Sequence, residues 1–171
     1  MHRLLLWITR NMPARVIKSD SLPYLLRYYV GQFLGRTWYL HQYLSPDAER
    51  HVHNHPHQGT TFSIVCRGRY LEERLVRLCP QHGLVTQKRL VRWVNILRPR
   101  DFHRILRPQP NTWTLFAFKR SDVHGWGFLR WRDQQVTYSN PLRGYARGGD
   151  HWWLKPETVP GWKLRARFDI R

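Results

Sequence analysis

Between residues 37 and 138 the chain alternates short apolar or aromatic runs with turn residues. Successive side chains of a β-strand point to opposite faces, and β-branched and aromatic residues favour strands. The pattern predicts eight strands, at 37–44, 60–66, 69–78, 84–97, 102–106, 113–118, 126–131 and 135–138. Arg67-Gly68 and His82-Gly83 are expected hairpin corners, because glycine adopts positive φ. Eight short strands without a convincing amphipathic helix predict an all-β fold, a sandwich or a small barrel.

The two ends of the chain carry a weaker pattern. Residues 1–36 are expected to form a lead-in arm, irregular or partly helical at first and then either helical or extended. Residues 140–171 show no period, and we expect a tail packed on the barrel because their tryptophans, Trp152, Trp153 and Trp162, are too apolar to leave in water. Residues 37–139 would then form one barrel domain, which suits a chain of 171 residues.

Charge and cysteine content indicate which partners and which cellular location to expect. The formal net charge is +18, and residues 61–120 contain 13 basic and 3 acidic side chains. Such an excess attracts nucleic acid or small anions, or it serves solubility alone.

Cys66 and Cys79 form no Cys-x-x-Cys pair, which excludes a zinc ribbon and makes a cytoplasmic location the default. Residues 1–19 carry no acid, so an organelle-targeting helix is the alternative. The apolar run Leu4–Ile8 is too short to span a bilayer, and no membrane partner is expected.

Four histidines at alternate positions, with a fifth about fifty residues on, are the strongest chemical signal: His51, His53, His55, His57 and His103. Fully extended, the first four would span roughly 20 Å, too far for one ion. Pro56 suits a strand end, which favours His53 and His55 as a ligand pair. His103 begins a later apolar strand and is the best-placed third ligand. Three neutral imidazoles leave coordination positions open, as catalytic metal sites require. An exposed histidine loop is the alternative.

These residues resemble the two half-motifs of the cupin superfamily. The resemblance rests on His53-Asn-His55, the strand that ends at the turn of Gly68, and the later strand with His103. It covers roughly residues 37–120. A looser resemblance, which extends to Trp113 and Trp126, is to small bacterial and phage cupin proteins that are described by fold. Both imply a single cupin barrel, the double-stranded β-helix, with a metal.

The sequence also departs from the cupin pattern. The glutamate that follows the histidine pair in the first motif is replaced by Gly59 or Thr60. In the second motif Arg100 and Arg107 stand where Gly and Asn are usual. The missing carboxylate makes three-histidine cupins, similar to cysteine dioxygenase, the closer analogue.

The resemblance implies one divalent metal ion, with Fe(II) as first choice and Zn, Ni, Mn or Cu as alternatives that imidazole also suits. Relatives of this kind hold a substrate carboxylate with an arginine and place a tyrosine near the metal, so Arg69, Arg104 and Tyr70 become candidate catalytic residues. Glu72 is a further candidate, as a metal ligand or a general base. The alternative is a surface charge that pairs with Arg74 or Arg77. A homodimer is also expected from the resemblance alone.

The resulting hypothesis is a metal-binding cupin, an Fe(II)-dependent dioxygenase-like enzyme that acts on a small anionic substrate. Two alternatives remain open. One is a non-catalytic basic cupin that binds nucleic acid or belongs to a larger assembly. The other is a metal-dependent isomerase or lyase for a sugar phosphate or nucleotide, because one fold supports many reactions.

Overall fold

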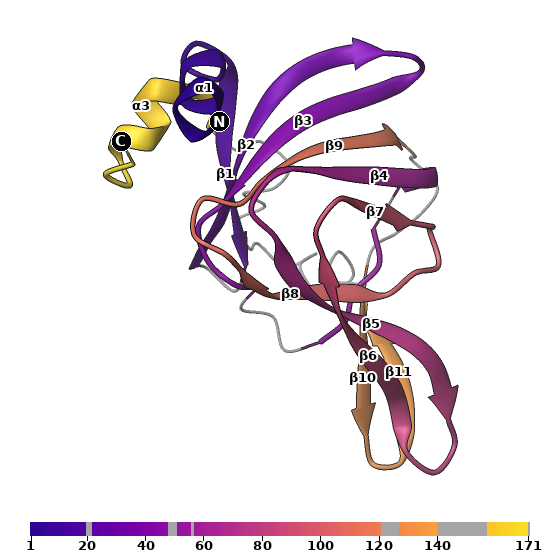
Figure 1. The fold of residues 1–171 in the computed structure, drawn as a ribbon. Helices are drawn as coiled ribbons and strands as arrows, with labels where there is room; N and C mark the ends of the chain where they lie inside the picture. Colours follow the sequence, from indigo (N-terminus) through magenta and orange to yellow (C-terminus); the bar gives the residue numbers. More distant parts are fainter. Residues whose placement is uncertain (20–21, 48–50, 56, 121–126, 140–156, 171) are drawn as a thin grey trace.

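A computed structural model describes the chain except for residues 20–21, 48–50, 56, 121–126, 140–156 and 171. Antiparallel strands dominate it and form two facing sheets that enclose the barrel interior (Figure 1). The larger sheet has the strand order β12-β1-β2-β3-β9-β4-β7. Its strands are β1 (Pro13–Ser19), β2 (Leu22–Phe33), β3 (Arg36–Tyr43), β4 (His57–Arg67), β7 (Val94–Leu97), β9 (Trp113–Arg120) and β12 (Val159–Pro160).

The smaller sheet has the order β6-β5-β8, with β5 (Tyr70–Cys79), β6 (Gly83–Val91) and β8 (His103–Pro108). His53 extends it, because it forms antiparallel bridges with His103 of β8 and with Phe128. Phe128 begins β10 (Phe128–Arg132), which pairs with β11 (Gln135–Ser139). The short stretch around His53 therefore joins this two-stranded hairpin to the smaller sheet.

This arrangement is a double-stranded β-helix, the jelly-roll barrel of the cupins. In one sheet the first barrel strand, β3, pairs with the last, β9, and β4 lies between β9 and β7. In the other sheet the His53 segment, β8, β5 and β6 follow in the same interleaved manner. The predicted all-β, cupin-type fold is confirmed.

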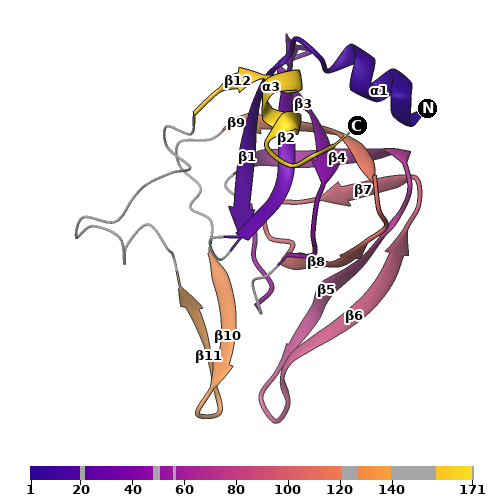
Figure 2. The same ribbon diagram turned by 90° about the vertical axis from the view of Figure 1, so that its left-hand side faces the viewer.

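The first 36 residues contribute two strands to the larger sheet as well as a short helix, α1 (His2–Ile8). Residues 13–19, expected to be irregular or helical, are strand β1, and the ambiguous run at 24–34 is strand β2 up to Phe33. The sheet's outer face is covered by α1 and by α3 (Gly161–Ala166), which lie side by side in Figures 1 and 2. The core between helices and sheet contains Leu5, Ala14, Leu26, Tyr28, Leu40, Trp113, Val159 and Leu164.

One of the two expected hairpin corners is correct and the other is wrong. Gly83 closes the β5–β6 hairpin with φ +71°. Gly68 also has positive φ, at +78°, but β4 and β5 do not pair, and its turn carries the chain from one sheet to the other. A Cβ at Gly68 would lie 2.5 Å from Thr112 Oγ1 and 3.0 Å from Thr112 Cα. The chain needs glycine here for close approach as well as for its backbone conformation.

The run at 84–97, expected to be one strand, is two. It breaks at Arg92-Trp93, and β6 and β7 on either side belong to different sheets. A crossover between sheets leaves no mark in this run, because apolar residues continue on both sides of the break and no Gly or Pro interrupts it.

Part of the expected C-terminal tail, including Trp152 and Trp153, lies outside the described residues. Its last segment contributes β12 and α3, which pack on β1 and α1. Trp162 does not fulfil the expectation of burial, because it is 52% exposed on α3. Among the described residues, no helix is long and apolar enough to cross a membrane.

Candidate metal centre

Three histidine side chains meet where the His53 segment runs beside β8. His53 and His103 exchange both backbone hydrogen bonds, at 3.0 and 2.9 Å, so their rings lie next to each other. His55 follows two residues later and turns its ring to the same place. One ring nitrogen from each of the three lies within 4.8 Å of the other two. The sequence's proposed ligands are thus brought together from segments about fifty residues apart.

The spacing of the ring nitrogens suits a shared ion. His55 Nε2 and His103 Nε2 are 2.8 Å apart. Two imidazole nitrogens, each about 2.0–2.1 Å from one metal, lie about 2.9–3.4 Å apart at octahedral or tetrahedral angles. The centroid of the His53 ring lies 5.1 Å from that of His55 and 5.5 Å from that of His103. A small inward shift of the His53 ring would bring its nitrogen to the same ion.

A buried carboxylate fixes the orientation of His103. Glu72 is fully buried on β5, and its Oε1 lies 2.6 Å from His103 Nδ1. With Nδ1–H donated to this carboxylate, Nε2 carries the lone pair and faces the other two histidines. Metal-binding histidines commonly donate their second N–H to a carboxylate in this way.

Glu72 itself sits in a network of donors. Asn95 Nδ2 donates to it at 2.7 Å and Arg89 Nε at 2.5 Å, while Arg74 lies at 3.4 Å. Burial alone would raise the pKa of Glu72, but the hydrogen bond from His103 and the nearby charges of His103 and Arg74 outweigh it and lower the pKa to about 2. The carboxylate is ionised at neutral pH and holds His103 in one tautomer.

A second carboxylate stands behind His53. Asp47 Oδ2 lies 3.7 Å from His53 Nδ1, and its other oxygen accepts a short hydrogen bond from Ser19 Oγ. The separation is too long for a hydrogen bond in this structure, but it places Nδ1 toward the acid and leaves Nε2 for the cluster. Two of the three histidines therefore have a carboxylate on the side away from the cluster.

His53 and His55 are held in the neutral form that binds metals. Burial, and then the charge of His103, lowers the pKa of His53 to about 3. Burial, and then the charges of His103 and His53, lowers the pKa of His55 well below its ordinary value.

The other candidate residues lie elsewhere or act through neighbours. Tyr70 is buried on the face of β5 that carries Glu72, and Asn95 Nδ2 donates to its hydroxyl at 3.1 Å. Burial raises the pKa of Tyr70 to about 12, so its hydroxyl keeps its proton. Arg104 follows His103 on the opposite face of β8 and pairs with Glu73 at 2.5 Å. Arg69 is exposed at the turn after Gly68, beside the Gln109 amide.

Four residues of the interior were missed by sequence reasoning. Asn95 links Tyr70 to Glu72, and its oxygen accepts hydrogen bonds from Arg74 and Arg89. Arg15, Arg27 and His41 line the inner face of the larger sheet, where Arg27 Nε donates to His41 Nε2 at 3.1 Å. Strands β1 and β2 carry apolar residues on both faces, because helices cover the outer face. The sequence therefore shows no alternation of apolar and polar residues that would indicate that Arg15 and Arg27 point inward.

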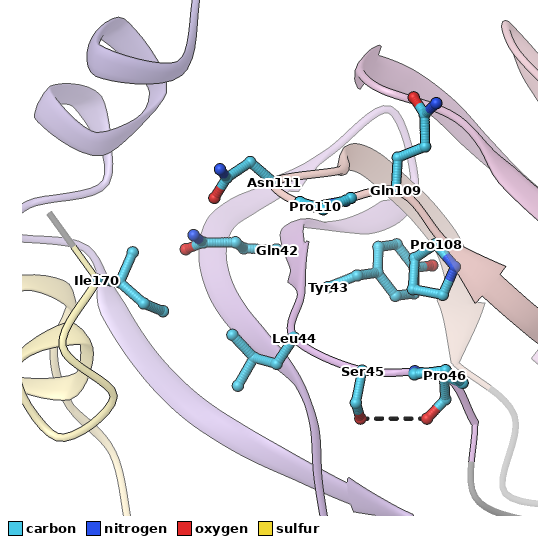
Figure 3. Close-up of a pocket in the computed structure, with 10 residues that line it drawn as sticks. All are labelled: Gln42, Tyr43, Leu44, Ser45, Pro46, Pro108, Gln109, Pro110, Asn111 and Ile170. Atoms are coloured by element: carbon cyan, nitrogen blue, oxygen red, sulfur yellow. Dashed lines mark hydrogen bonds between the residues drawn. The ribbon is translucent and has the colours of Figure 1, made fainter.

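A pocket of about 270 Å³ lies apart from this cluster and contains none of its histidines. It is formed by the end of β3 and the β8–β9 connection, with Ile170 of the C-terminal segment on its far side (Figure 3). The side chains that line it bring no pair of titratable groups together. The histidine cluster, by contrast, gathers three residues that could hold a metal ion.

The fold and the cluster together define a cupin barrel with a candidate three-histidine metal centre. No protein-family model and no curated protein matches the chain in sequence. Similar solved structures are hydroxypropylphosphonic acid epoxidase from S. wedmorenis, a double-stranded β-helix protein from Klebsiella pneumoniae and Streptomyces albus HEPD, the last with 2-hydroxyethylphosphonate and Fe(II) bound.

The likeness to these structures extends to the fold alone. The epoxidase is 11% identical over 62% of this chain and 55% of its own, with a TM-score of 0.42. The Klebsiella protein is 15% identical over 67% and 90%, with a TM-score of 0.43. HEPD is 10% identical over 83% and 28%, with a TM-score of 0.46. The chain thus spans about half the length of the epoxidase.

Proposed function

We propose that the protein binds one divalent metal ion, Fe(II) as first choice, through His53, His55 and His103, and that it is a dioxygenase-like oxidoreductase for a small anionic substrate. The observation that carries the proposal is the convergence of three ring nitrogens within 4.8 Å, one of them 2.6 Å from a fully buried carboxylate on its far side.

The donor set fits a catalytic rather than a purely structural ion. Three imidazoles leave one position open in a four-coordinate site and three in a six-coordinate site, whereas structural sites are closed by four protein ligands. A bound Fe(II) would supply redox chemistry with dioxygen at those positions. The chain's own part is to hold the ligands oriented, through Glu72 beneath His103 and Asp47 behind His53.

The candidate residues take different roles in this proposal. Glu72 is a positioning residue, because His103 and three other donors surround its carboxylate. Tyr70 lies beside it through Asn95 and shapes the interior. Substrate binding by Arg69 or Arg104 remains a prediction without structural support. The described residues likewise add no observation in favour of nucleic-acid binding or an isomerase reaction.

Metal content tests the site. Untagged protein, loaded with Fe(II) without oxygen and then desalted, should retain one metal ion per chain by inductively coupled plasma mass spectrometry. His55→Ala and His103→Ala should lose most of it. His82→Ala is the matched control, because His82 is exposed at the β5–β6 turn, and it should retain the ion. Full occupancy in both cluster variants would end the proposal.

Dioxygen uptake then tests the reaction. The Fe(II)-loaded protein should consume dioxygen in the presence of at least one member of a panel of small carboxylates, thiols, phosphates and phosphonates, and His55→Ala should not. A metal-loaded protein that converts a sugar phosphate without consuming dioxygen would favour the isomerase alternative.

A further inference from the structure

Two arginine side chains share the inner face of the larger sheet. Arg15 of β1 pairs in register with Arg27 of β2, and Arg27 with His41 of β3. The guanidinium carbons of Arg15 and Arg27 lie 5.9 and 5.2 Å from the centre of the same ring, that of Tyr39. The residue between Tyr39 and His41, Leu40, packs in the core under the helices, so Tyr39 and His41 must face the other way, into the barrel.

The two charges lack an acidic partner. No carboxylate among the described residues lies within ion-pairing distance of Arg15 or Arg27, although the interior holds Glu72 and Asp47. Of the five N–H donors of the Arg27 side chain, Nε–H alone has a partner in the described part of the chain, His41. Arg15 Nε is buried and has no partner there.

Such a pair is costly unless something completes it. Buried charges in proteins are normally paired, and two like charges around one ring repel each other. Burial, and then the charge of Arg15, lowers the pKa of Arg27 to about 10, but it stays a cation at neutral pH. Forked guanidinium groups are the preferred partners of carboxylate and phosphate oxygens. Both arginines are only partly buried, so a solute can reach them.

The cationic pair and the histidine cluster face the same interior. A series of ring contacts joins them: His41 lies 5.0 Å from Phe116, Phe116 lies 5.8 Å from His57, and His57 lies 5.5 Å from His55. The ligands come from the smaller sheet and its flanking segment, whereas the arginines come from β1 and β2 of the larger sheet. The charge of Arg27 is also among the causes that lower the pKa of His55, so the cationic pair lies within electrostatic reach of the cluster.

We infer that Arg27, assisted by Arg15, is the binding site for an oxyanion, a carboxylate or a phosphate-type group, carried by the small molecule whose reaction the metal centre performs. The assignment to a substrate rests on the proposed function. The oxyanion site itself rests on the arginine pair. His41 acts as a positioning residue, because its Nε2 holds the Arg27 fork by one edge and leaves the other donors free for the ligand.

Calorimetric titration with inorganic phosphate and with acetate, at low ionic strength, tests the oxyanion site. The wild type should bind at least one of them, and Arg27→Met should weaken that binding at least about 10-fold, as expected for a lost charge-assisted hydrogen bond. Arg15→Met should weaken it less. Arg77→Met removes the same charge from an exposed position on β5 and should leave it unchanged. Stronger binding of phosphate assigns a phosphate or phosphonate group, and stronger binding of acetate assigns a carboxylate.

A footprint on the wild type keeps the test independent of folding of the variants. Phosphate or acetate should protect Arg27 from modification by phenylglyoxal, as detected by mass spectrometry, and should leave the exposed Arg77 reactive. Absence of binding up to about 10 mM, equal binding by Arg27→Met, or loss of binding once a chelator has removed the metal would each overturn the inference. A protein that holds no metal but still binds the anion through Arg27 would end the proposed function and keep the oxyanion site.

Discussion

Replacement of Glu72 by glutamine tests the network beneath the metal ligands. Glutamine keeps the shape of the side chain and one acceptor oxygen, but it removes the charge and presents an NH₂ group to surroundings made of donors. His103 Nδ1, Asn95 Nδ2 and the Arg89 guanidinium all point at the present carboxylate. An amide can satisfy one or two of these donors and must oppose another.

The size of the effect follows from burial. Removal of one partner from a buried charged network costs about 3–5 kcal/mol. Arg89 and Arg74 have side chains 39% and 20% exposed and can turn partly to water, which reduces the cost. We expect Glu72→Gln to lower the free energy of unfolding by about 2–4 kcal/mol and the affinity for metal by about 10- to 100-fold.

Urea unfolding of the metal-free protein and competition with a metal indicator measure the two effects. Glu73→Gln is the matched control, because Glu73 is the next residue, faces outward and pairs with Arg104. That change should cost less than about 1 kcal/mol and leave metal affinity unaltered. If Glu72→Gln were no more destabilising than Glu73→Gln and bound metal as the wild type does, Glu72 would not position His103.

The pH dependence of the unfolding free energy provides a second test of Glu72. The pKa of Glu72 is lowered from 4.5 to about 2, so its ionised form stabilises the native state by about 3 kcal/mol. This contribution is complete above about pH 4.5, the value in the unfolded chain, and is lost as pH falls toward about 2. The difference in stability between wild type and Glu72→Gln should therefore shrink over that range.

Three further changes probe other parts of the molecule. Asp47→Asn should lower metal affinity less than the change at Glu72, in the same indicator assay, because the acid lies 3.7 Å from its histidine. Gly68→Ala should lower the unfolding free energy more than Gly35→Ala. Both glycines have positive φ, but only Gly68 faces a neighbouring backbone. Equal losses of about 1–2 kcal/mol in the two variants would show that backbone strain, and not close approach, accounts for the cost. His41 has a pKa well below 6.5 because of burial and then the charge of Arg27. The native state thus loses up to about 1.4 kcal/mol per pH unit from this residue as pH falls below 6.5, and denaturation curves of His41→Gln should show a shallower decline.

The sequence predicted those parts of the protein that depend on local spacing. Alternate histidines next to a proline, and a later histidine at a strand start, were enough to identify His53, His55 and His103 as companions. Strand alternation likewise predicted most of the barrel strands. Both predictions depend on residues two positions apart, and the extended backbone itself places such residues on the same face of a strand.

Sequence reasoning named Glu72 as a candidate without giving its partners, and it missed Arg27, because both answers depend on which sheet a residue joins. Glu72 is preceded by Leu71 and followed by Glu73, and only the pairing of β5 with β8, shifted between Leu71 and Glu72, turns it toward His103. Arg27 stands among apolar residues in a strand that is covered on both faces. In neither case does the local pattern tell inside from outside.

The two sheets contribute different groups to the site, which explains why the chain's first 36 residues matter to it. The smaller sheet and its flanking segment supply the histidines and the ionised Glu72, whereas the cationic pair comes from β1 and β2, ahead of the first barrel strand β3. Glu72 is already occupied by four donors, so it does not neutralise Arg27 across the barrel. The larger sheet therefore presents to the candidate metal centre a positive charge that no acidic residue in the described part of the chain pairs with. That asymmetry favours an anionic molecule between the sheets and gives part of the +18 net charge a defined place inside the barrel.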